Sequence, residues 1–372
     1  MARLGDYVRI RTGKLDANAS SENGRYPFFT CAVEPLRIDS YSYDCECVLV
    51  AGNGDLNVKY YNGKFDAYQR TYIIESIEKS VLSVPYLYFF LDKYVETLRY
   101  EAIGGVIKYI KLGNLTEAQI PLLSLEEQAK VVCEIDKAND LISLRKQQLQ
   151  KLDELVKARF IELFGDPIDN PKGLPVKTLK ELSTLITNGN TPKGGSENYV
   201  DNGILFLRSQ NIWRNRIELD DVAYIDEATH RSLKKSSVKH KDILITKTGR
   251  INTENSSLGR AALYLGADDS ANINGHVYLV RLDGSVVPEY VVTILTSEAY
   301  RKYIRKVCVG GIDKRQINLD QVEDFPIILP SVEMQEQFAA FVKQTDKSKV
   351  VVQKALDEAQ LLFDSLMQKY FG

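Results

Sequence analysis

Side chains able to read nucleic-acid bases are concentrated in four short segments between positions 208 and 316. Arginine makes paired hydrogen bonds to guanine, and asparagine or glutamine makes them to adenine. The segment from Arg208 to Arg216 offers both kinds of side chain beside the single tryptophan of the chain. Solvation of these side chains in turns is the alternative interpretation. The candidate DNA-contacting residues of the four segments are Arg208, Ser209, Gln210, Asn211, Arg214, Arg216, Lys247, Arg250, Asn272, Asn274, Lys314 and Arg315.

A smaller set of such side chains precedes position 120. There, Val48–Gly54 resembles Ile243–Gly249, since each reads as a short apolar strand that enters a glycine-containing turn. The later turn carries the second of the four segments, so counterparts are expected around the earlier one. The candidates in this part of the chain are Asn53, Lys59, Lys64, Gln69, Arg70 and Lys108.

Sequence motifs for catalysis are not found. A methyltransferase would need its own cofactor site, and the Asp/Asn-Pro-Pro-aromatic tetrapeptide does not occur. The phosphate-binding loop GxxxxGK[ST] does not occur either. Asp242 and Lys247 keep a nuclease function as a hypothesis, because a carboxylate and a lysine can hold a metal ion and activate water. Against it, no second acidic residue lies beside the lysine. The three histidines lack metal-ligand spacing and the five cysteines form no CxxC pair. The sequence therefore predicts no catalytic residue, no metal site and reduced thiols.

Length and composition limit the class of protein. At 372 residues the chain is long enough for two or three domains. Its 44% apolar and 26% charged residues are typical of a globular protein and exclude a disordered one. No apolar run reaches the ~18–20 residues that cross a bilayer, and no apolar core of a secretory signal follows the first basic residues. The net charge is −2, and only residues 171–323, with 22 basic and 18 acidic side chains, are net positive.

A duplicated helical segment is visible in the second and fourth quarters of the chain. Ser124–Gly165 aligns with Ser331–Gly372 without a gap, at a shift of 207 positions. Apolar residues recur at steps of three and four, which is typical of one face of a helix and, when sustained, of a coiled-coil seam. Chain order predicts antiparallel pairing, because the first helix delivers the next unit to its far end. The expected seam consists of Leu149, Leu152, Val156, Leu163, Val352, Leu356, Ala359, Phe363, Leu366 and Tyr370.

The repeat extends upstream and divides the chain into domains. Each helix follows a Gly-Gly pair and then an apolar–Pro step, Ile120-Pro121 in the first copy and Phe325-Pro326 in the second. The segment 165–173 is rich in Pro, Gly, Asp and Asn, which is typical of a linker. The expected fold class is α+β, with mixed α/β units at 1–120 and 176–325, long helices at 121–165 and 326–372, and a linker at 166–175.

The two helix entries resemble those of specificity subunits of type I restriction–modification systems. The motifs are Ile120–Gln128 and Phe325–Gln335, in which a proline precedes a Ser-x-Glu-x-Gln helix start. Leu207–Ile212 and Asp242–Leu244 are also similar to motifs of that family's target recognition domains. The resemblance covers essentially the whole chain, and two copies in the right order make it specific.

That resemblance implies a non-catalytic, DNA-binding subunit that reads a split double-stranded target. Each α/β unit would be a target recognition domain for one half-site. The helix pair would act as a spacer and dock two modification subunits, which methylate adenine, and restriction subunits would join the complex. S-adenosylmethionine, ATP and Mg²⁺ would then be bound by those partners, whereas this chain would bind no cofactor. A cytoplasmic complex for defence against foreign DNA is implied.

A protein-interaction scaffold is the alternative from a different functional class. In that hypothesis the helices form a coiled coil and the globular units bind protein or peptide. The near-zero net charge favours it, because contacts to phosphate need lysine and arginine. The four segments rich in Arg, Asn and Gln favour DNA instead. A neighbouring gene for an adenine methyltransferase would distinguish the two hypotheses.

Overall fold

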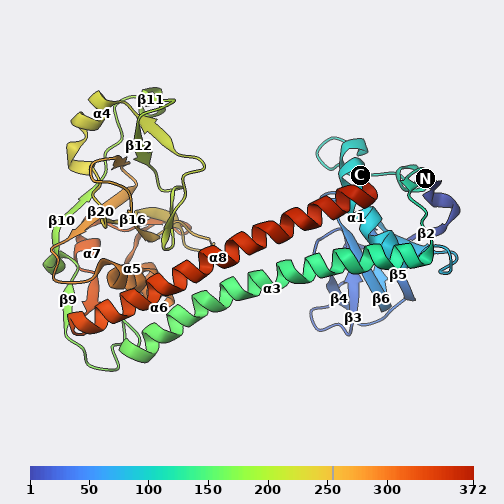
Figure 1. Cartoon of the computed structure of the whole chain (residues 1–372), viewed down its shortest axis with the longest axis horizontal. Helices are drawn as coiled ribbons and strands as arrows, with labels where there is room; N and C mark the ends of the chain where they lie inside the picture. The colour runs from blue at the N-terminus through green and yellow to red at the C-terminus, as the bar shows by residue number, and fades with distance from the viewer. Residues whose placement is uncertain (254) are drawn as a thin grey trace. The chain divides into compact units, whose positions relative to one another are not determined.

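The chain forms two compact units in a computed structural model that describes residues 1–253 and 255–372. Unit 1 comprises Met1–Gln148 and Val352–Gly372, and unit 2 comprises Leu149–Val351. Figure 1 shows the order of the elements along the chain. Each unit contains part of both long helices, so the compact units differ from the sequence repeats. No described helix is both long enough and apolar enough to cross a membrane.

Unit 1 is built on one six-stranded sheet with the order β2-β7-β5-β6-β3-β4, and a separate pair, β1 and β8. Its strands are β1 (Ala2–Arg3), β2 (Val8–Thr12), β3 (Tyr26–Phe29), β4 (Leu36–Ile38), β5 (Tyr43–Ala51), β6 (Val58–Ala67), β7 (Thr71–Ser76) and β8 (Gln119–Ile120). Its shorter helices are α1 (Val84–Glu101) and α2 (Leu112–Thr116).

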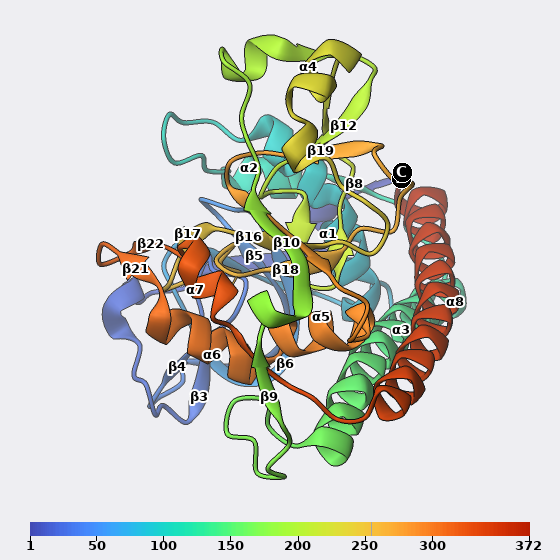
Figure 2. The same ribbon diagram turned by 90° about the vertical axis from the view of Figure 1, so that its left-hand side faces the viewer.

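Unit 2 contains two four-stranded sheets, with the orders β10-β20-β16-β18 and β11-β15-β12-β19, and three smaller ones, β17-β22-β21, β13-β14 and β23-β9. Its strands are β9 (Val176–Thr178), β10 (Ser183–Asn188), β11 (Tyr199–Val200), β12 (Ile204–Leu207), β13 (Ile212–Trp213), β14 (Arg216–Ile217), β15 (Ala223–Ile225), β16 (Ile243–Thr246), β17 (Thr248–Arg250), β18 (Ala261–Leu263), β19 (Ala271–Ile273), β20 (Val277–Leu282), β21 (Val309–Gly310), β22 (Lys314–Gln316) and β23 (Pro326–Ile328). Its shorter helices are α4 (Glu227–Ser232), α5 (Pro288–Thr296), α6 (Glu298–Val307) and α7 (Leu319–Glu323), and Figure 2 shows this unit towards the viewer.

The duplication inferred from the sequence is present in the sheets. The order β2-β7-β5-β6 in unit 1 corresponds to β10-β20-β16-β18 in unit 2, and every neighbouring pair in both is antiparallel. The first unit extends this sheet with β3 and β4. The second instead inserts the separate sheet of β11, β12, β15 and β19, which the sequence did not reveal. The central strands β5 and β16 end in runs of buried apolar residues, as expected for strands covered on both faces.

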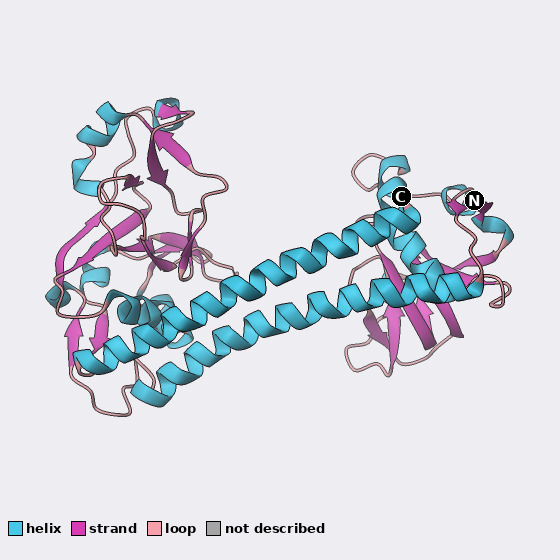
Figure 3. Ribbon diagram, viewed as in Figure 1, coloured by secondary structure: helices cyan, strands magenta, loops and turns pink. Residues whose placement is uncertain are grey.

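Two helices of equal length follow the sheets, as the repeat predicts. Helix α3 spans Leu125–Phe164 and α8 spans Val332–Phe371, 40 residues each (Figure 3). Ser124 begins α3 with a capping box, because Glu127 accepts a bond from the Ser124 backbone N–H at 2.9 Å and the Ser124 hydroxyl accepts one from the Glu127 N–H at 3.3 Å. Gly165 ends the helix with φ of 78°, a conformation that favours glycine.

The helices pair in opposite directions within each unit, which confirms the expected antiparallel coiled coil. In unit 1 the Tyr370 hydroxyl near the end of α8 donates a 2.7 Å bond to Glu134 near the start of α3. In unit 2 Lys349 forms a 2.7 Å ion pair with Asp153. All ten expected seam residues are buried or half-buried. The same period continues upstream through positions the sequence reading did not include, Val131, Ile135, Ala138, Ile142, Phe338, Val342 and Thr345.

Aromatic clusters fix the ends of these helices to the globular parts. In unit 1, Phe371 packs 5.1 Å from Tyr86 of α1 and 6.2 Å from Phe90, measured between ring centroids. In unit 2, Phe164 packs 5.0 Å from Tyr290 of α5. Phe164 and Phe371 are equivalent in the repeat, so each globular part is held by the last turn of a different helix.

Candidate nucleic-acid interface

The same backbone arrangement positions the candidate residues in both units. At the end of β5, the Gly52 N–H donates to Arg70 at 2.8 Å and the Gly52 carbonyl accepts from Ile110 at 3.0 Å. At the end of β16, the Lys247 N–H donates to His276 at 2.9 Å and its carbonyl accepts from Ile317 at 3.0 Å. In each unit, therefore, three loops meet at one end of the four strands that the two units share: the loops at Gly52, Arg70 and Ile110 in unit 1, and those at Lys247, His276 and Ile317 in unit 2. These loops and the hairpins beside them contain about half of the candidates predicted from the sequence, whereas Arg208–Arg216 of unit 2 lie on a separate segment after β12.

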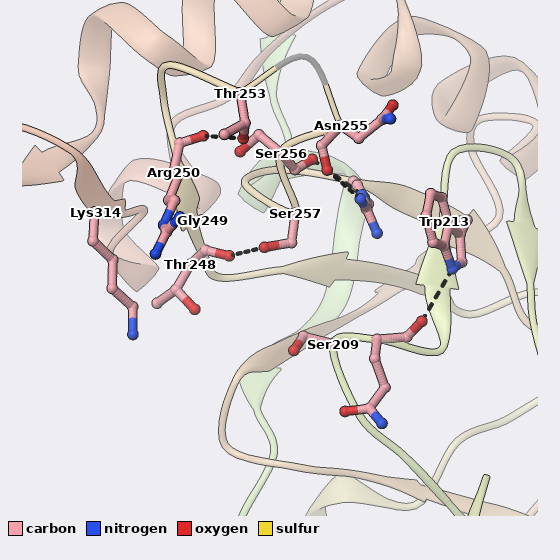
Figure 4. A pocket seen from close by; sticks show the side chains of 12 residues that line it. Ser209, Trp213, Thr248, Gly249, Arg250, Thr253, Asn255, Ser256, Ser257 and Lys314 are labelled. Atoms are coloured by element: carbon pink, nitrogen blue, oxygen red, sulfur yellow. Dashed lines mark hydrogen bonds between the residues drawn. The ribbon is translucent and has the colours of Figure 1, made fainter. Parts of the chain in front are cut away.

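In unit 2 a cavity of about 530 Å³ lies beside the loop after β16, and most of its lining residues carry polar or charged side chains (Figure 4). Four predicted residues, Ser209, Gln210, Arg250 and Lys314, come together in its lining from three separate segments. Other lining residues are Trp213, Thr248, Gly249, Thr253, Asn255, Ser256, Ser257 and Arg260. Arginine, lysine, amide and hydroxyl groups are thus presented with one aromatic ring, a set that can bind phosphate, hydrogen-bond base edges and stack on bases.

Arg260 holds one wall of this cavity. Its guanidinium carbon lies 3.8 Å from the centroid of the Trp213 ring, and its Nε donates a 3.0 Å bond to the Ser256 carbonyl. A further bond reaches the carbonyl of Asn255. Burial, followed by the charge of Arg214, lowers the pKa of Arg260 from its usual value. Neither Arg260 nor Trp213 was among the predicted contact residues, because the 46 intervening residues hide their contact.

Three predicted residues have structural roles instead, and the expectation that they contact bases is revised. Asn211 is 2% exposed; its amide donates to the carbonyls of Glu218 and Asp221 at 3.0 and 2.9 Å. Asn272 is fully buried and bonds to Leu233 and Ser236. Asn274 is also buried and accepts the N–H of His276. Their amides stabilise loops, because a buried amide without partners would cost free energy.

Arg208 is largely buried as well. It forms a 3.1 Å ion pair with Asp221 and packs against the ring of Tyr199. Its Nε is buried and has no hydrogen-bond partner among the residues that the structure describes. The guanidinium therefore supports the loop from which Ser209 and Gln210 enter the cavity.

Of the remaining predicted residues of unit 2, Arg216 and Lys247 lie near the cavity, and Arg315 lies on the hairpin formed by β21 and β22. Arg216 is exposed, forms a 2.7 Å ion pair with Glu218 and lies 5.3 Å from the Trp213 ring. The Lys247 ammonium is 5.6 Å from the ring of Tyr278. Arg315 donates to the Gly311 carbonyl at 3.2 Å. Arg214 instead lies towards α6, where burial and then the charge of Arg301 lower its pKa.

In unit 1 five of the six predicted residues gather around the loop after β5. Asn53 pairs with Tyr109, and the Gly54 N–H donates to the Lys108 carbonyl at 2.9 Å. Gln69 and Arg70 are exposed in the loop that accepts the Gly52 N–H. Lys59 binds the Asn57 side chain in the same region, and burial lowers its pKa.

Lys64 is the exception in unit 1. It lies towards the other end of β6, where its ammonium is 4.7 Å from the ring of Tyr41. Pairing of Asp44 with Lys64 and of Leu49 with Lys59 places the two lysines far apart along the strand. Lys64 is therefore not brought together with the other five candidates.

The nuclease alternative finds no support at Asp242. This carboxylate is 2% exposed and bonds to the Arg281 guanidinium at 2.9 and 2.7 Å, with a third bond from the Lys239 N–H. Among the described residues, no group of three His, Cys, Asp or Glu could hold a metal ion. Asp242 is thus half of a buried ion pair. All five cysteines are free thiols.

Known proteins similar to this chain include specificity subunits of type I restriction enzymes. The family model of the type I restriction modification DNA specificity domain matches residues 1–154 and 171–359. The specificity subunit of the Escherichia coli enzyme EcoDI is 38% identical over 154 residues, 41% of this chain and 34% of that subunit. The specificity subunit of MjaIX from Methanocaldococcus jannaschii is 25% identical over 284 residues, 72% of this chain and 62% of that subunit. The alignments therefore span about one third and three fifths of these relatives.

A solved structure shares the fold. The S subunit of a type I restriction–modification system from M. genitalium superposes with a TM-score of 0.62 at 16% identity, covering 100% of this chain and 95% of that one. The two matches of the family model cover both repeats of this chain, including both Ser-x-Glu-x-Gln helix starts. The chain therefore belongs to the type I restriction–modification DNA specificity family, whose members are specificity subunits and not the catalytic ones.

Proposed function

We propose that this chain reads a bipartite double-stranded DNA target, one half-site per unit, within a type I restriction–modification complex. One observation carries the proposal: candidate base-reading residues occur at the same end of the same four-stranded sheet in both units. Asn53, Arg70 and Lys108 in unit 1, and Arg250 and Lys314 in unit 2, lie on or beside loops joined by the same two backbone hydrogen bonds, and Ser209 and Gln210 join the latter pair in the lining of the cavity. Duplicated surfaces of this kind suit a target made of two separated parts.

The contacts are divided between two kinds of residue in this proposal. Arg250 and Lys314 are exposed cations at the cavity of unit 2, and they position the phosphate backbone. Ser209 and Gln210 supply short-range donors and acceptors for base edges. The overall charge of −2 is compatible with DNA binding because partner subunits share the phosphate contacts.

Two modification subunits are the proposed partners of the helices. Unit 1 exposes Leu144 of α3 and Leu362 of α8, and unit 2 exposes Val351 of α8 and Leu155 of α3. The shift of 207 positions relates Leu144 to Val351 and Leu155 to Leu362. Leu155, Val351 and Leu362 directly precede the seam residues Val156, Val352 and Phe363, so these exposed side chains flank the seam. Two repeat-related apolar sites are suited to two copies of one partner, with restriction subunits added to that assembly.

The cofactors belong to those partners in this scheme. S-adenosylmethionine is proposed to bind the modification subunits, and ATP and Mg²⁺ the restriction subunits, whereas the present chain contributes specificity in the cytoplasm. Without a partner, the purified chain is expected to leave DNA unmethylated and uncut when all three cofactors are supplied.

Co-expression with the modification subunit tests the proposal. Mapping of N6-methyladenine across a methylation-free host genome should yield one split sequence, and omission of either chain should abolish it. Methylation or cleavage by the purified chain alone would contradict the assignment. Equal methylation with and without the chain would favour a scaffold instead.

A further inference from the structure

Each unit exposes a branched apolar side chain at the tip of a hairpin beside the candidate interface. Val106 is fully exposed in unit 1, and Ile312 is 89% exposed in unit 2. Both follow a Gly-Gly pair, at 104–105 and 310–311. A single exposed apolar residue needs no explanation, but the same exposure at the same place in two diverged copies does.

The hairpin of unit 1 is short and closed at its base. Ile103 and Tyr109 exchange backbone hydrogen bonds of 3.0 and 2.9 Å, and Lys108 accepts the Gly54 N–H at 2.9 Å. The hairpin is therefore joined to the loop that carries Asn53. Ile103, Ile107 and Tyr109 are exposed in addition to the tip residue.

The hairpin of unit 2 has the same construction. Strand β21 pairs with β22 at Val309 and Gln316, and β22 pairs with β17 at Gln316 and Thr248. Lys314, two residues beyond the tip, lines the cavity. In unit 1 the tip belongs to a hairpin that is bridged to Asn53, and in unit 2 it belongs to the three-stranded sheet β17-β22-β21. Each of these elements also carries candidate base-reading residues.

The backbone at each tip depends on its first glycine. Gly104 has φ of 120° and Gly310 has φ of 132°, values that disfavour any residue with a side chain. A Cβ atom at Gly104 would lie 2.6 Å from the Ile107 carbonyl oxygen, and one at Gly310 would lie 2.9 Å from that of Lys314. Both tips therefore need a glycine at the same point of the turn, although the turn of unit 2 is one residue longer, and both leave the apolar residue exposed.

An exposed basic residue follows each tip. Lys108 lies two residues after Val106 and Lys314 two residues after Ile312, and Arg250 forms an exposed 3.3 Å pair with Asp313 beside the second tip. An apolar tip beside a cation suits a polyanion with an apolar interior. Stacked bases within the phosphate backbones of a duplex have that character, and proteins insert Ile, Leu, Phe or Met between base steps.

We propose that Val106 and Ile312 are wedges that enter duplex DNA and partly unstack one base step in each half-site. This inference rests on the proposed function, because it places the tips against DNA bound at the candidate interfaces. The wedge supplies discrimination without base-specific hydrogen bonds. Steps that unstack at low cost, such as TA and CA, are favoured at the contacted position.

The test uses the full chain with duplexes that carry its methylation-defined target and 2-aminopurine at successive steps. Wild-type protein should raise the fluorescence at one step in each half-site. Val106→Ala should remove the signal in one half-site and Ile312→Ala in the other, and each should weaken binding about tenfold, which corresponds to ~1.4 kcal/mol. Matched controls are Ile77→Ala and Leu265→Ala, which are exposed residues that follow β7 and β18 at the ends of these strands away from Gly52 and Lys247. Both controls should leave the fluorescence and affinity unchanged.

A second duplex separates a wedge from an ordinary apolar contact. A mismatch placed at the responsive step is already unstacked, so Ala variants should bind it within about twofold of wild type. Weakened binding that the mismatch does not restore, or no fluorescence change with wild-type protein, would overturn the wedge while leaving DNA reading intact. Absence of sequence-preferring binding by the wild-type complex would overturn the proposed function as well.

Discussion

Gln128 accepts a 2.9 Å hydrogen bond from the backbone N–H of Ser83, which joins the first turn of α3 to the residue preceding α1. The Gln128 amide also donates to the carbonyls of Val81 and Leu123. In unit 2, Gln335 likewise accepts from Val287 at 3.0 Å and donates to Pro330 at 3.0 Å. Both glutamines are buried, so each helix entry is fixed by one side chain with multiple bonds.

Gln128→Ala is expected to destabilise unit 1 by about 2–6 kcal/mol. A buried N–H and at least one carbonyl lose their partner, at ~1–3 kcal/mol each. Gln335→Ala should do the same in unit 2. Urea unfolding followed by circular dichroism measures the change, with the exposed Gln147→Ala of α3 as the control. Equal stability of Gln128→Ala and Gln147→Ala would show that the bonds do not fix the helix entry.

Arg250→Ala and Gln210→Ala are expected to affect DNA recognition without affecting folding. Both side chains are exposed at the cavity of unit 2. Gln210→Ala removes a base contact and should relax one half-site by about 1–3 kcal/mol, leaving the other unchanged. Arg250→Ala removes a phosphate contact and should weaken binding uniformly across sequences. Methylation mapping and binding titrations with each variant measure both effects, and the reverse assignment of the two outcomes would contradict the division of roles.

Asn211→Ala is expected to act on stability before it acts on recognition. Its buried amide bridges the backbone of Arg208, Glu218 and Asp221, so truncation leaves buried polar groups without partners. The melting temperature of the variant should fall, whereas Gln210→Ala should melt like wild type. An unchanged melting temperature with altered half-site preference would restore Asn211 to the base-contacting set.

Asp92 on α1 gives unit 1 a pH dependence. Burial raises the pKa of its carboxyl group in the folded chain above the unfolded value. The charged form is therefore disfavoured by folding, so this residue lowers stability in full above its folded pKa, and the penalty declines as the pH falls from the folded pKa to the unfolded pKa. Asp92→Asn should raise the melting temperature at pH 7, and its advantage should shrink towards pH 4. The exposed Asp39→Asn is the control, and equal shifts for both variants would argue against the burial penalty.

Helix length is expected to determine the number of base pairs between the half-sites. Seven residues inserted both after Gln148 and after Val351 preserve the seam and add about 10.5 Å at ~1.5 Å per residue. At ~3.4 Å per base pair, the spacer should lengthen by about three base pairs with unchanged half-sites. Two residues inserted at both places turn the seam by about 200° and should impair assembly. Methylation mapping checks both variants, and an unchanged spacer in the first would show that the helices do not set it.

The helices and the duplicated sheet were predictable because their signals are local. Apolar steps of three and four, a capping serine and a terminal glycine predict each 40-residue helix. The strand before Gly52 and its counterpart before Lys247 were likewise visible as apolar runs. The additional sheet of unit 2 was not, because its strands β11, β12, β15 and β19 contain two to four residues each and pair across long intervals.

The site was only partly predictable, because an amide has the same sequence signature whether it is buried or exposed. Gln210 and Asn211 are neighbours with opposite surroundings: the first is exposed at the cavity and the second is enclosed by backbone carbonyls. Arg260 and Trp213 approach each other through the fold rather than along the chain. By contrast, the motif of a proline followed by Ser-x-Glu-x-Gln correctly predicted where both long helices begin.

The packing of Phe371 on Tyr86 has a consequence for the exchange of segments between related chains. A foreign segment at residues 1–120 would bring its own side chains at positions 86 and 90 to a resident helix end that contributes Phe371. Such an exchange is therefore expected to keep the packing only where these three positions fit one another. Chimaeras that pair a foreign first unit with a matched residue 363–372 segment should accordingly assemble more often than simple substitutions.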